Sequence, residues 1–147
     1  MTEEIITHSA EETTQWGREF AKRLTPPVLV MLTGELGSGK TTLTKGIVAG
    51  LGAAQEDEVT SPTFTLVHVY GGNEVNKIYH ADLYRIENFR DFETLGLEDV
   101  FAKPAVAILE WSERFPLQSP WPQIRVRLEH LGADIRRIQV DPSVGGP

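Results

Sequence analysis

The chain contains no cysteine, and this absence excludes several kinds of chemistry at once. Without thiols there is no disulfide framework, no cysteine nucleophile and no cysteine-based metal site. Long apolar stretches are also missing, since runs such as Val28–Leu32 are far too short to span a membrane. The first residues, Met1–Glu4, are acidic, whereas a secretory signal begins with basic residues. We therefore expect a cytoplasmic protein.

Basic residues are also in short supply. Lys and Arg number 14 against 21 Asp and Glu, which gives a formal net charge of -7. Proteins that bind nucleic acid unaided usually carry a basic footprint, because contacts to phosphates dominate that affinity. If RNA is involved, we expect another protein to hold it.

The length of 147 residues leaves room for one domain with one modest core. Apolar residues make up 40% of the chain and charged residues 24%, which is ordinary for a globular protein. We expect a single domain over residues 1–141 and a loose tail over residues 142–147.

Apolar residues recur at helical spacing in some segments and form short runs in others. The spacing of Ser9 and Glu12 is that of a capping box and predicts a helix that ends before Pro26. A second helix is expected over Lys40–Leu51, and a short third one after Asn88.

Strands are expected between these helices. The uninterrupted apolar runs Val28–Leu32 and Ala105–Leu109 are typical of strands covered on both faces. Glycines at 71, 72 and 132 predict turns of two hairpins. The remaining strands are expected at Ile5–Thr7, 64–70, Ile78–Leu83, Ile124–Leu128 and Ile135–Val140.

A glycine-rich stretch lies between the first apolar strand and the second helix. Residues Gly34–Thr41 read Gly-Glu-Leu-Gly-Ser-Gly-Lys-Thr and fit G-x-x-x-x-G-K-[ST], the Walker A pattern of a P-loop. Glycines let the backbone N–H groups converge on a phosphate chain, and the helix that follows points its positive end at the anion. Lys40 supplies a cation for the β and γ phosphates of ATP, and the Thr41 hydroxyl can bind Mg²⁺.

The residues expected to bind the nucleotide are Gly37, Ser38, Gly39, Lys40, Thr41 and Thr42. Together with the strand pattern, the motif predicts an α/β fold. We expect a P-loop NTPase-like mixed sheet with helices on both faces and antiparallel additions.

A P-loop needs an acidic residue near the metal, and two candidates end strands. Glu110 follows a fully apolar strand, which is the position of a Walker B acid, and Asp82 follows a less apolar one. Either carboxylate could hold Mg²⁺ or orient the attacking water. Each could instead be a strand-end carboxylate that faces solvent or caps a turn, and the pattern leaves these alternatives open.

Three other features have a functional and a structural interpretation. The hydroxyls of Thr60–Thr63 resemble a switch segment that senses the γ-phosphate, but a hydroxyl-rich turn closed by proline would look the same. His80 could carry protons, although a packed and hydrogen-bonded strand residue is the interpretation we favour. Trp111 could line the nucleotide site or belong to the core.

Two families of P-loop proteins can be compared with this pattern. GTP specificity has no support, because no Asp is followed three positions later by Gly and the guanine-binding motif is incomplete at Asn76–Tyr79. A kinase of a small metabolite is harder to exclude. Kinases usually need an arginine-bearing lid, and only Arg85 and Arg90 lie close together in the central region.

The order and spacing of motifs from about residue 10 to 115 resemble the bacterial TsaE (YjeE) ATPases. The resemblance rests on Gly34–Thr42, Thr60–Val67, His80–Arg85, Leu95–Leu97 and Leu109–Trp111. The family usually has Asp, Ala and a bulky aromatic residue where this chain has Glu35, Ser38 and Ala81. These departures remove none of the proposed ligands.

The resemblance implies a role in the synthesis of N6-threonylcarbamoyladenosine at position 37 of tRNAs that read ANN codons. Such a protein does not transfer the group itself. It binds a TsaD–TsaB assembly, and its ATP hydrolysis resets that assembly between rounds. By the same resemblance, Thr41 and Glu110 would hold Mg²⁺, and Asp82 would serve hydrolysis. We therefore expect Asp82 and, from the Walker A motif, Lys40 to be the catalytic residues.

Alternatives from other functional classes remain at this point. One is a free-standing kinase that phosphorylates a small metabolite. Another is a nucleotide-gated binding module that barely hydrolyses ATP. These alternatives would be distinguished by measuring ATP turnover in three mixtures. They are the protein alone, the protein with candidate acceptors, and the protein with TsaD-like and TsaB-like partners.

Overall fold

The fold was determined as a computed structural model of residues 1–147. It describes residues 3–35, 38–53, 59, 67–71, 77–83, 88, 90, 103–110 and 121–141. Within these ranges the chain forms strands and helices in the order β1 (Glu3–Thr7), α1 (Ala10–Ala21), β2 (Val28–Thr33), α2 (Lys40–Gly50), β3 (Val67–Tyr70), β4 (Ile78–Asp82), β5 (Val106–Glu110), β6 (Gln123–Gly132) and β7 (Ile135–Asp141).

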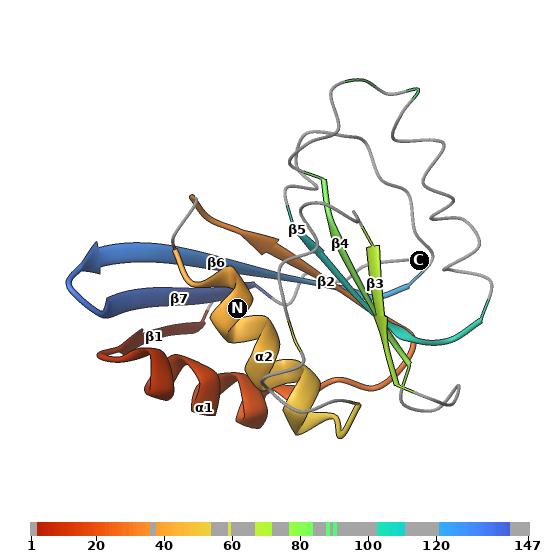
Figure 1. The fold of residues 1–147 in the computed structure, drawn as a ribbon, viewed down its shortest axis with the longest axis horizontal. Coiled ribbons are helices and arrows are strands. Elements are labelled where there is room, and N and C mark those ends of the chain that lie inside the picture. Colours follow the sequence, from red (N-terminus) through yellow and green to blue (C-terminus); the bar gives the residue numbers. More distant parts are fainter. Residues whose placement is uncertain are drawn as a thin grey trace.

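All described strands belong to one seven-stranded sheet with the order β1-β7-β6-β2-β5-β4-β3 (Figure 1). Strand β2 lies at the centre and runs parallel to both β5 and β6, and β5 runs parallel to β4. The outer pairs β3–β4, β6–β7 and β7–β1 are antiparallel. The predicted mixed sheet with antiparallel additions is therefore confirmed, and both predicted hairpins are present.

Alternate residues of the central strands face opposite sides of the sheet, because side chains along a strand alternate with a period of two. Val28, Val30 and Leu32 of β2 pack in a core cluster that also contains side chains of α1 and α2. Leu29 lies in a second cluster with residues of β4 and β5 and with Trp121. The uninterrupted apolar sequence of β2 is thus explained by burial on both faces.

Both described helices cover the same face of the sheet (Figure 1). The prediction placed helices on both faces, but within the described ranges neither helix lies on the second face. The short helix predicted after Asn88 falls mostly outside the described residues. Among the described helices, none combines the length and apolarity that crossing a bilayer requires.

Helix α1 begins where the capping box predicts. The Ser9 hydroxyl accepts a hydrogen bond of 3.0 Å from the Glu12 backbone N–H, and the Glu12 carboxylate accepts one of 3.3 Å from the His8 backbone N–H. The predicted cap is confirmed, although Glu12 reaches the residue before Ser9 instead of Ser9 itself. These contacts satisfy backbone donors that a helix start otherwise leaves open.

Helices α1 and α2 approach so closely that glycine is required between them. A Cβ on Gly46 would lie 2.2 Å from the Thr14 carbonyl oxygen, and one on Gly17 would lie 2.8 Å from the Leu43 carbonyl oxygen. No real Cβ tolerates such distances without movement of the backbone. The glycines therefore hold α2, and with it the end of the P-loop, firmly against α1.

Candidate functional site

The P-loop connects the central strand β2 to the first turn of α2. Gly34 has a φ of 150°, and Gly39, which caps α2 without a side-chain hydrogen bond, has a φ of 105°. A Cβ on Gly34 would lie 2.6 Å from the Ser38 hydroxyl oxygen and 2.7 Å from the Leu128 carbonyl oxygen. Both positions need glycine, as the motif indicated, because the backbone angles or the close contacts exclude a side chain.

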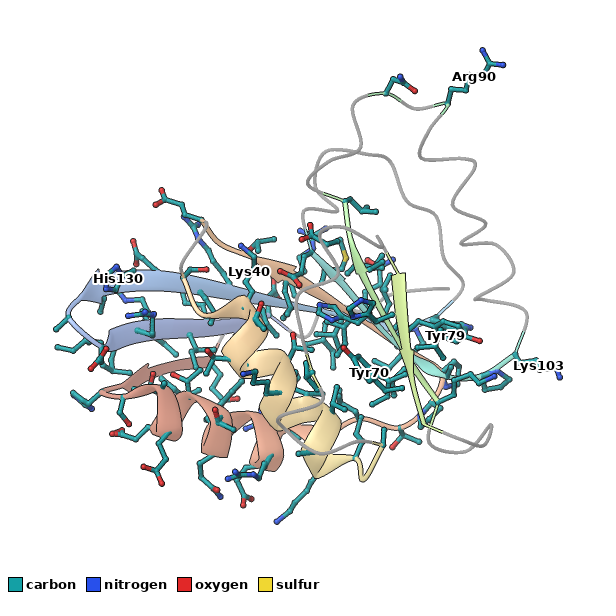
Figure 2. The ribbon with its side chains drawn as sticks, in the orientation of Figure 1. Lys40, Tyr70, Tyr79, Arg90, Lys103 and His130 are labelled. Atoms are coloured by element: carbon teal, nitrogen blue, oxygen red, sulfur yellow. The ribbon has the colours of Figure 1, made fainter. Side chains whose placement is uncertain are left out.

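The Lys40 side chain folds back over the loop from which the helix starts. Its ammonium donates hydrogen bonds to the carbonyl oxygens of Gly34 and Glu35, the second at 3.1 Å, and the residue is only 6% exposed. Lys40 lies at the start of α2, at the edge where the central strands end (Figure 2). The cation is therefore held at the positive end of the helix, where an anion would be attracted by both.

The other predicted nucleotide ligands surround this lysine along the chain. Ser38 is 2% exposed, and its hydroxyl makes no hydrogen bond within the described part of the chain. Thr41 and Thr42 are half-buried in the first turn of α2. Gly37 lies outside the described residues, so its role stays a prediction.

The two predicted acids meet at one edge of the sheet. Asp82 and Glu110 occupy paired positions at the carboxyl ends of the parallel strands β4 and β5, and Leu32 of β2 pairs with Glu110 on the other side. The P-loop begins two residues after Leu32, so both carboxylates end at the same edge as the loop. They are 4% and 3% exposed, which excludes the alternative of solvent-facing strand ends.

Alternation along the strands also decides which face the carboxylates share. Ile78 and Ile108 belong to the core cluster under α1 and α2. Asp82 and Glu110 follow them at even spacing and therefore lie on the face that carries α2. Both acids consequently lie on the side of the sheet toward which Lys40 and its helix are placed.

A buried histidine contacts one of these acids. The Nε2 atom of His80 lies 2.5 Å from Oε2 of Glu110, and His80 is completely buried. The interpretation of His80 as a packed, hydrogen-bonded strand residue is confirmed. The sequence did not reveal its partner, although the position of His80 two residues before Asp82 places both side chains on the same face of the strand.

The donor set suits a magnesium ion. Within the described ranges, no three His, Asp or Glu side chains come together to hold a metal. A hydroxyl and one or two carboxylates are nevertheless what Mg²⁺ uses beside phosphates, because it keeps several waters and seldom takes a cage made of protein alone. Thr41, Glu110 and Asp82 are all oxygen donors and fit this ion.

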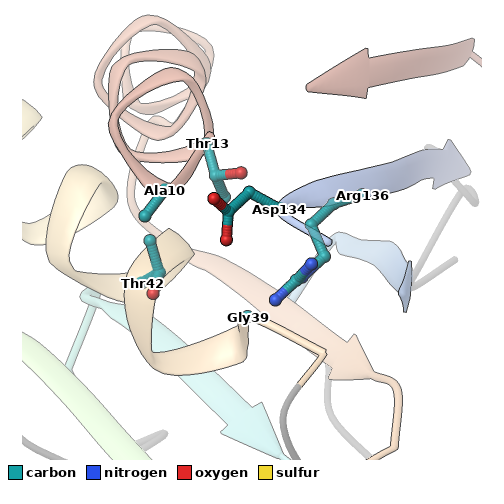
Figure 3. Close-up of a pocket in the computed structure, with 6 residues that line it drawn as sticks. All are labelled: Ala10, Thr13, Gly39, Thr42, Asp134 and Arg136. Carbon is teal, nitrogen blue, oxygen red and sulfur yellow. The ribbon is translucent and has the colours of Figure 1, made fainter. Parts of the chain in front are cut away.

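The hairpin of β6 and β7 lies beside the start of α2, on the side opposite the strands that carry Asp82 and Glu110. Asp134 and Arg136 line a cavity of about 30 Å³ together with Gly39 and Thr42 of the P-loop region and with Ala10 and Thr13 of α1 (Figure 3). A volume of this size holds roughly one water molecule or hydroxyl group. Sequence reasoning missed Asp134 and Arg136, because nothing local to the hairpin indicates that it folds next to a loop far away along the chain.

Two side chains hold the tip of this hairpin. Ala133 has a φ of 46°, which L-residues rarely adopt. Its carbonyl oxygen lies 2.7 Å from His130 Nε2 and accepts a hydrogen bond of 3.3 Å from Arg136 Nη1. These contacts stabilise the turn that carries Asp134 beside the start of α2. A second cavity, of about 230 Å³, is lined by Gly34, Glu35 and Ser38 and by residues 127–130 of β6.

Two predicted features lie outside the described residues. They are the switch-like segment Thr60–Thr63 and Trp111. The functional and the structural interpretation of each remain predictions.

The family model described as "Threonylcarbamoyl adenosine biosynthesis protein TsaE" matches residues 7–138. A tRNA threonylcarbamoyladenosine biosynthesis protein TsaE from Treponema pallidum is 36% identical over 135 residues, covering 92% of this chain and 97% of the relative. The protein of the same name from Streptomyces coelicolor is 39% identical over 131 residues, covering 88% and 78%.

A solved structure agrees with these relatives. The crystal structure of Bacillus subtilis YdiB superposes with a TM-score of 0.75 at 28% identity, covering 97% of this chain and 87% of the YdiB chain. The family model spans residues 7–138, and these relatives match most of the chain at 36% and 39% identity. The chain therefore belongs to the TsaE family of tRNA threonylcarbamoyladenosine biosynthesis proteins.

Proposed function

We propose that this protein binds ATP with Mg²⁺ and hydrolyses it in support of tRNA threonylcarbamoyladenosine synthesis, acting on a TsaD–TsaB assembly. One observation carries the proposal above the others. The Lys40 ammonium is held over a P-loop at the same sheet edge where two buried carboxylates, Asp82 and Glu110, end parallel strands.

The P-loop residues would bind the phosphate chain. The backbone N–H groups over residues 37–42 and the positive end of α2 attract the anion, and Lys40 neutralises charge on the β and γ phosphates. The ammonium already has two carbonyl acceptors in the loop. On nucleotide binding, the phosphate oxygens would become additional acceptors for this ammonium, which would then contact both the loop and the nucleotide.

The two carboxylates would have different roles in metal binding and in activation of the attacking water. Thr41 and Glu110 would hold Mg²⁺, which neutralises charge on the β and γ phosphates when bound. Asp82, on the neighbouring strand, would orient the attacking water and accept its proton. Burial suits both acids to these roles, because a carboxylate removed from solvent is a stronger electrostatic partner for a metal or a water than an exposed one.

The nucleoside would leave the phosphates on the side opposite these acids. Thr42 and Gly39 border the cavity lined by Asp134 and Arg136 (Figure 3). Arg136 brings a cation to the end of the P-loop, and Asp134 brings a carboxylate that can accept a hydrogen bond from a ribose hydroxyl. The volume of the cavity, about 30 Å³, matches one such hydroxyl group and is too small for a base.

The partners would supply the contact with tRNA. The net charge of -7 opposes unaided binding to a polyanion. TsaD-like and TsaB-like proteins would therefore hold the tRNA, and the nucleotide state of this chain would alter its affinity for them. Such coupling requires different affinities in the ATP and ADP states, since a partner that binds both equally shifts nothing.

The test measures ATP turnover by the purified chain alone, with candidate small-metabolite acceptors, and with TsaD-like and TsaB-like proteins added. Faster phosphate release in the presence of the partners, with no phosphorylated acceptor, is the expected result. Transfer of phosphate to a metabolite would establish a kinase instead. ATP binding without turnover in any mixture would establish a nucleotide-gated binding module.

The second part of the test concerns RNA. Binding of tRNA to the isolated chain should be weak at physiological salt, whereas binding of the partner assembly should differ between an ATP analogue and ADP. Tight, salt-sensitive tRNA binding by this chain alone would contradict the proposed division of labour.

A further inference from the structure

We propose that His80 is a positioning residue that holds the Glu110 carboxylate in the orientation required for Mg²⁺ binding, an inference that rests on the proposed function of this site. It goes further than that function in assigning a role to a buried residue outside the P-loop.

The contact between the two side chains is short and completely enclosed. His80 Nε2 and Glu110 Oε2 are 2.5 Å apart, with His80 at 0% exposure and Glu110 at 3%. At this burial a carboxylate needs a hydrogen-bond partner, because an unpaired polar group inside a protein is costly. Within the described part of the chain, His80 is the side chain recorded as bonded to Glu110.

The tautomer follows from the same geometry. The other ring nitrogen, Nδ1, is buried and has no hydrogen-bond partner within the described residues. A proton on Nε2 gives Glu110 a donor and leaves only a lone pair without a partner at Nδ1. A proton on Nδ1 would leave a buried N–H unsatisfied and would turn two acceptors toward each other.

The strand register explains why the contact with His80 fixes the orientation of the Glu110 carboxylate. Glu110 pairs with Asp82, and His80 lies two residues before Asp82 on the same face of β4. The imidazole therefore approaches Glu110 diagonally from the neighbouring strand β4, from a position two residues further from the carboxyl edge of the sheet. One carboxylate oxygen is bonded back toward the core, so the side chain cannot rotate freely at the strand end.

A metal-binding carboxylate is usually oriented in this way by a second hydrogen bond, and removing such a partner typically weakens metal affinity by about 10- to 100-fold. The Nε2 atom of His80 is already engaged with Glu110, and Mg²⁺ prefers oxygen ligands to either ring nitrogen. We therefore assign His80 to support of the ligand and not to the metal itself.

The experiment compares three substitutions at one position. His80→Met removes the donor and retains an unbranched side chain that adapts to core gaps, and His80→Leu is a second variant of the same kind. His80→Gln keeps an amide N–H at a position close to Nε2. Ile78→Ala serves as the control, because Ile78 is buried on the same face of the same strand and has no polar contact with Glu110.

The measurement is the Mg²⁺ concentration that gives half-maximal binding of a fluorescent, non-hydrolysable ATP analogue, with binding in EDTA measured separately. His80→Met and His80→Leu should raise that concentration about tenfold and leave binding in EDTA unchanged. His80→Gln should restore most of the loss. Ile78→Ala should lower the thermal midpoint without moving the Mg²⁺ titration.

A double variant tests whether His80 acts through Glu110. In a Glu110→Gln background, His80→Met should cause no further shift of the Mg²⁺ titration. A further shift of the same size, or wild-type Mg²⁺ dependence in folded His80→Met and His80→Leu, would overturn the assignment while the ATP site stands. Absence of Mg²⁺-dependent nucleotide binding in the wild-type chain would overturn the proposed function as well as this inference.

Discussion

Glu110 at the end of β5 is 3% exposed and bonded to a histidine, whereas Glu129 on β6 is exposed and paired with Arg137 at 2.7 Å. The contrast extends to their strands. Every residue of β5 is buried, but in β6 only Val126 and Leu128 are. We call β2, β5 and β4 the loop half of the sheet, and β6, β7 and β1 the hairpin half.

The two halves show how one residue type acquires different roles. In the loop half, parallel strands are covered on both faces, and their buried polar side chains are His80 in the middle of β4 and Asp82 and Glu110 at the strand ends. In the hairpin half, successive residues of the antiparallel strands alternate between buried and more exposed positions, and the charged side chains lie at the surface. Buried carboxylates such as Glu110 are suited to ligand binding and catalysis, whereas exposed carboxylates such as Glu129 form weak surface ion pairs.

The largest expected effect separates two lysines of the same helix. Lys40→Ala removes the cation that the loop holds and should lower ATP turnover by at least about 100-fold, as the loss of a preorganised charge at a reacting phosphate does. Lys45→Ala, five residues further along α2, should leave turnover close to that of the wild type. Phosphate release with circular dichroism as the folding control checks both, and full activity in folded Lys40→Ala would contradict the P-loop assignment.

The next effect separates two aspartates at strand ends. Asp82→Asn should lower turnover by about 100-fold or more, the usual contribution of a positioned base, with nearly unchanged nucleotide affinity. Asp141→Asn, at the exposed end of β7, should change neither quantity. Single-turnover kinetics and a nucleotide-binding titration give the two values, and a loss of affinity without a loss of rate would remove Asp82 from the chemistry.

A third effect compares the two glutamates. Glu110→Gln should raise the Mg²⁺ concentration for half-maximal activity by more than about tenfold, since a direct ligand matters at least as much as the residue that supports it. Glu129→Gln should leave that concentration unchanged. If Asp82→Asn shifts the magnesium requirement and Glu110→Gln does not, the roles assigned to the two acids are reversed.

A fourth effect concerns the helix contact beneath the P-loop. Gly46→Ala would place a methyl group 2.2 Å from the Thr14 carbonyl oxygen and force α1 and α2 apart. We expect a loss of about 1–3 kcal/mol in the free energy of unfolding, which is typical of overpacking, measured by urea denaturation. Lys45→Ala, at the neighbouring position, should change stability by less than about 0.5 kcal/mol. Equal stability of both variants would mean that the helices are not packed as described.

The smallest effect belongs to the hairpin half. Arg23 donates hydrogen bonds of 2.6 and 3.0 Å to the Glu3 carboxylate and thereby lowers its pKa below the usual value. The resulting stability is present above the pKa of unfolded Glu3 and is lost as the pH falls through the lower folded value.

Because both side chains are well exposed, solvent screens this pair, and its contribution should stay below about 1 kcal/mol. Glu3→Gln should therefore reduce the free energy of unfolding slightly at neutral pH and not at all in acid below the carboxyl range. Urea denaturation at both pH values checks this, and a difference that persists in acid would assign the effect to packing.

Much of the fold could be predicted because its signals are local. The capping box at Ser9 and Glu12, the apolar runs of β2 and β5, and the turn at Gly132 each follow from neighbouring residues and short-range physics. The P-loop could be predicted for the same reason, since its glycines, Lys40 and the start of α2 are contiguous. The strand-end positions of Asp82 and Glu110 also followed from sequence.

The neighbours of these residues could not be predicted, because they depend on strand order and register. Sequence by itself determined that a P-loop follows a buried strand and that two acids end other strands. Only the tertiary structure decided that Asp82 and Glu110 are paired and buried, that His80 bonds Glu110, and that Asp134 reaches the start of α2. Local patterns set which elements form, whereas the contacts between side chains distant along the chain arise only when the sheet brings particular strands together.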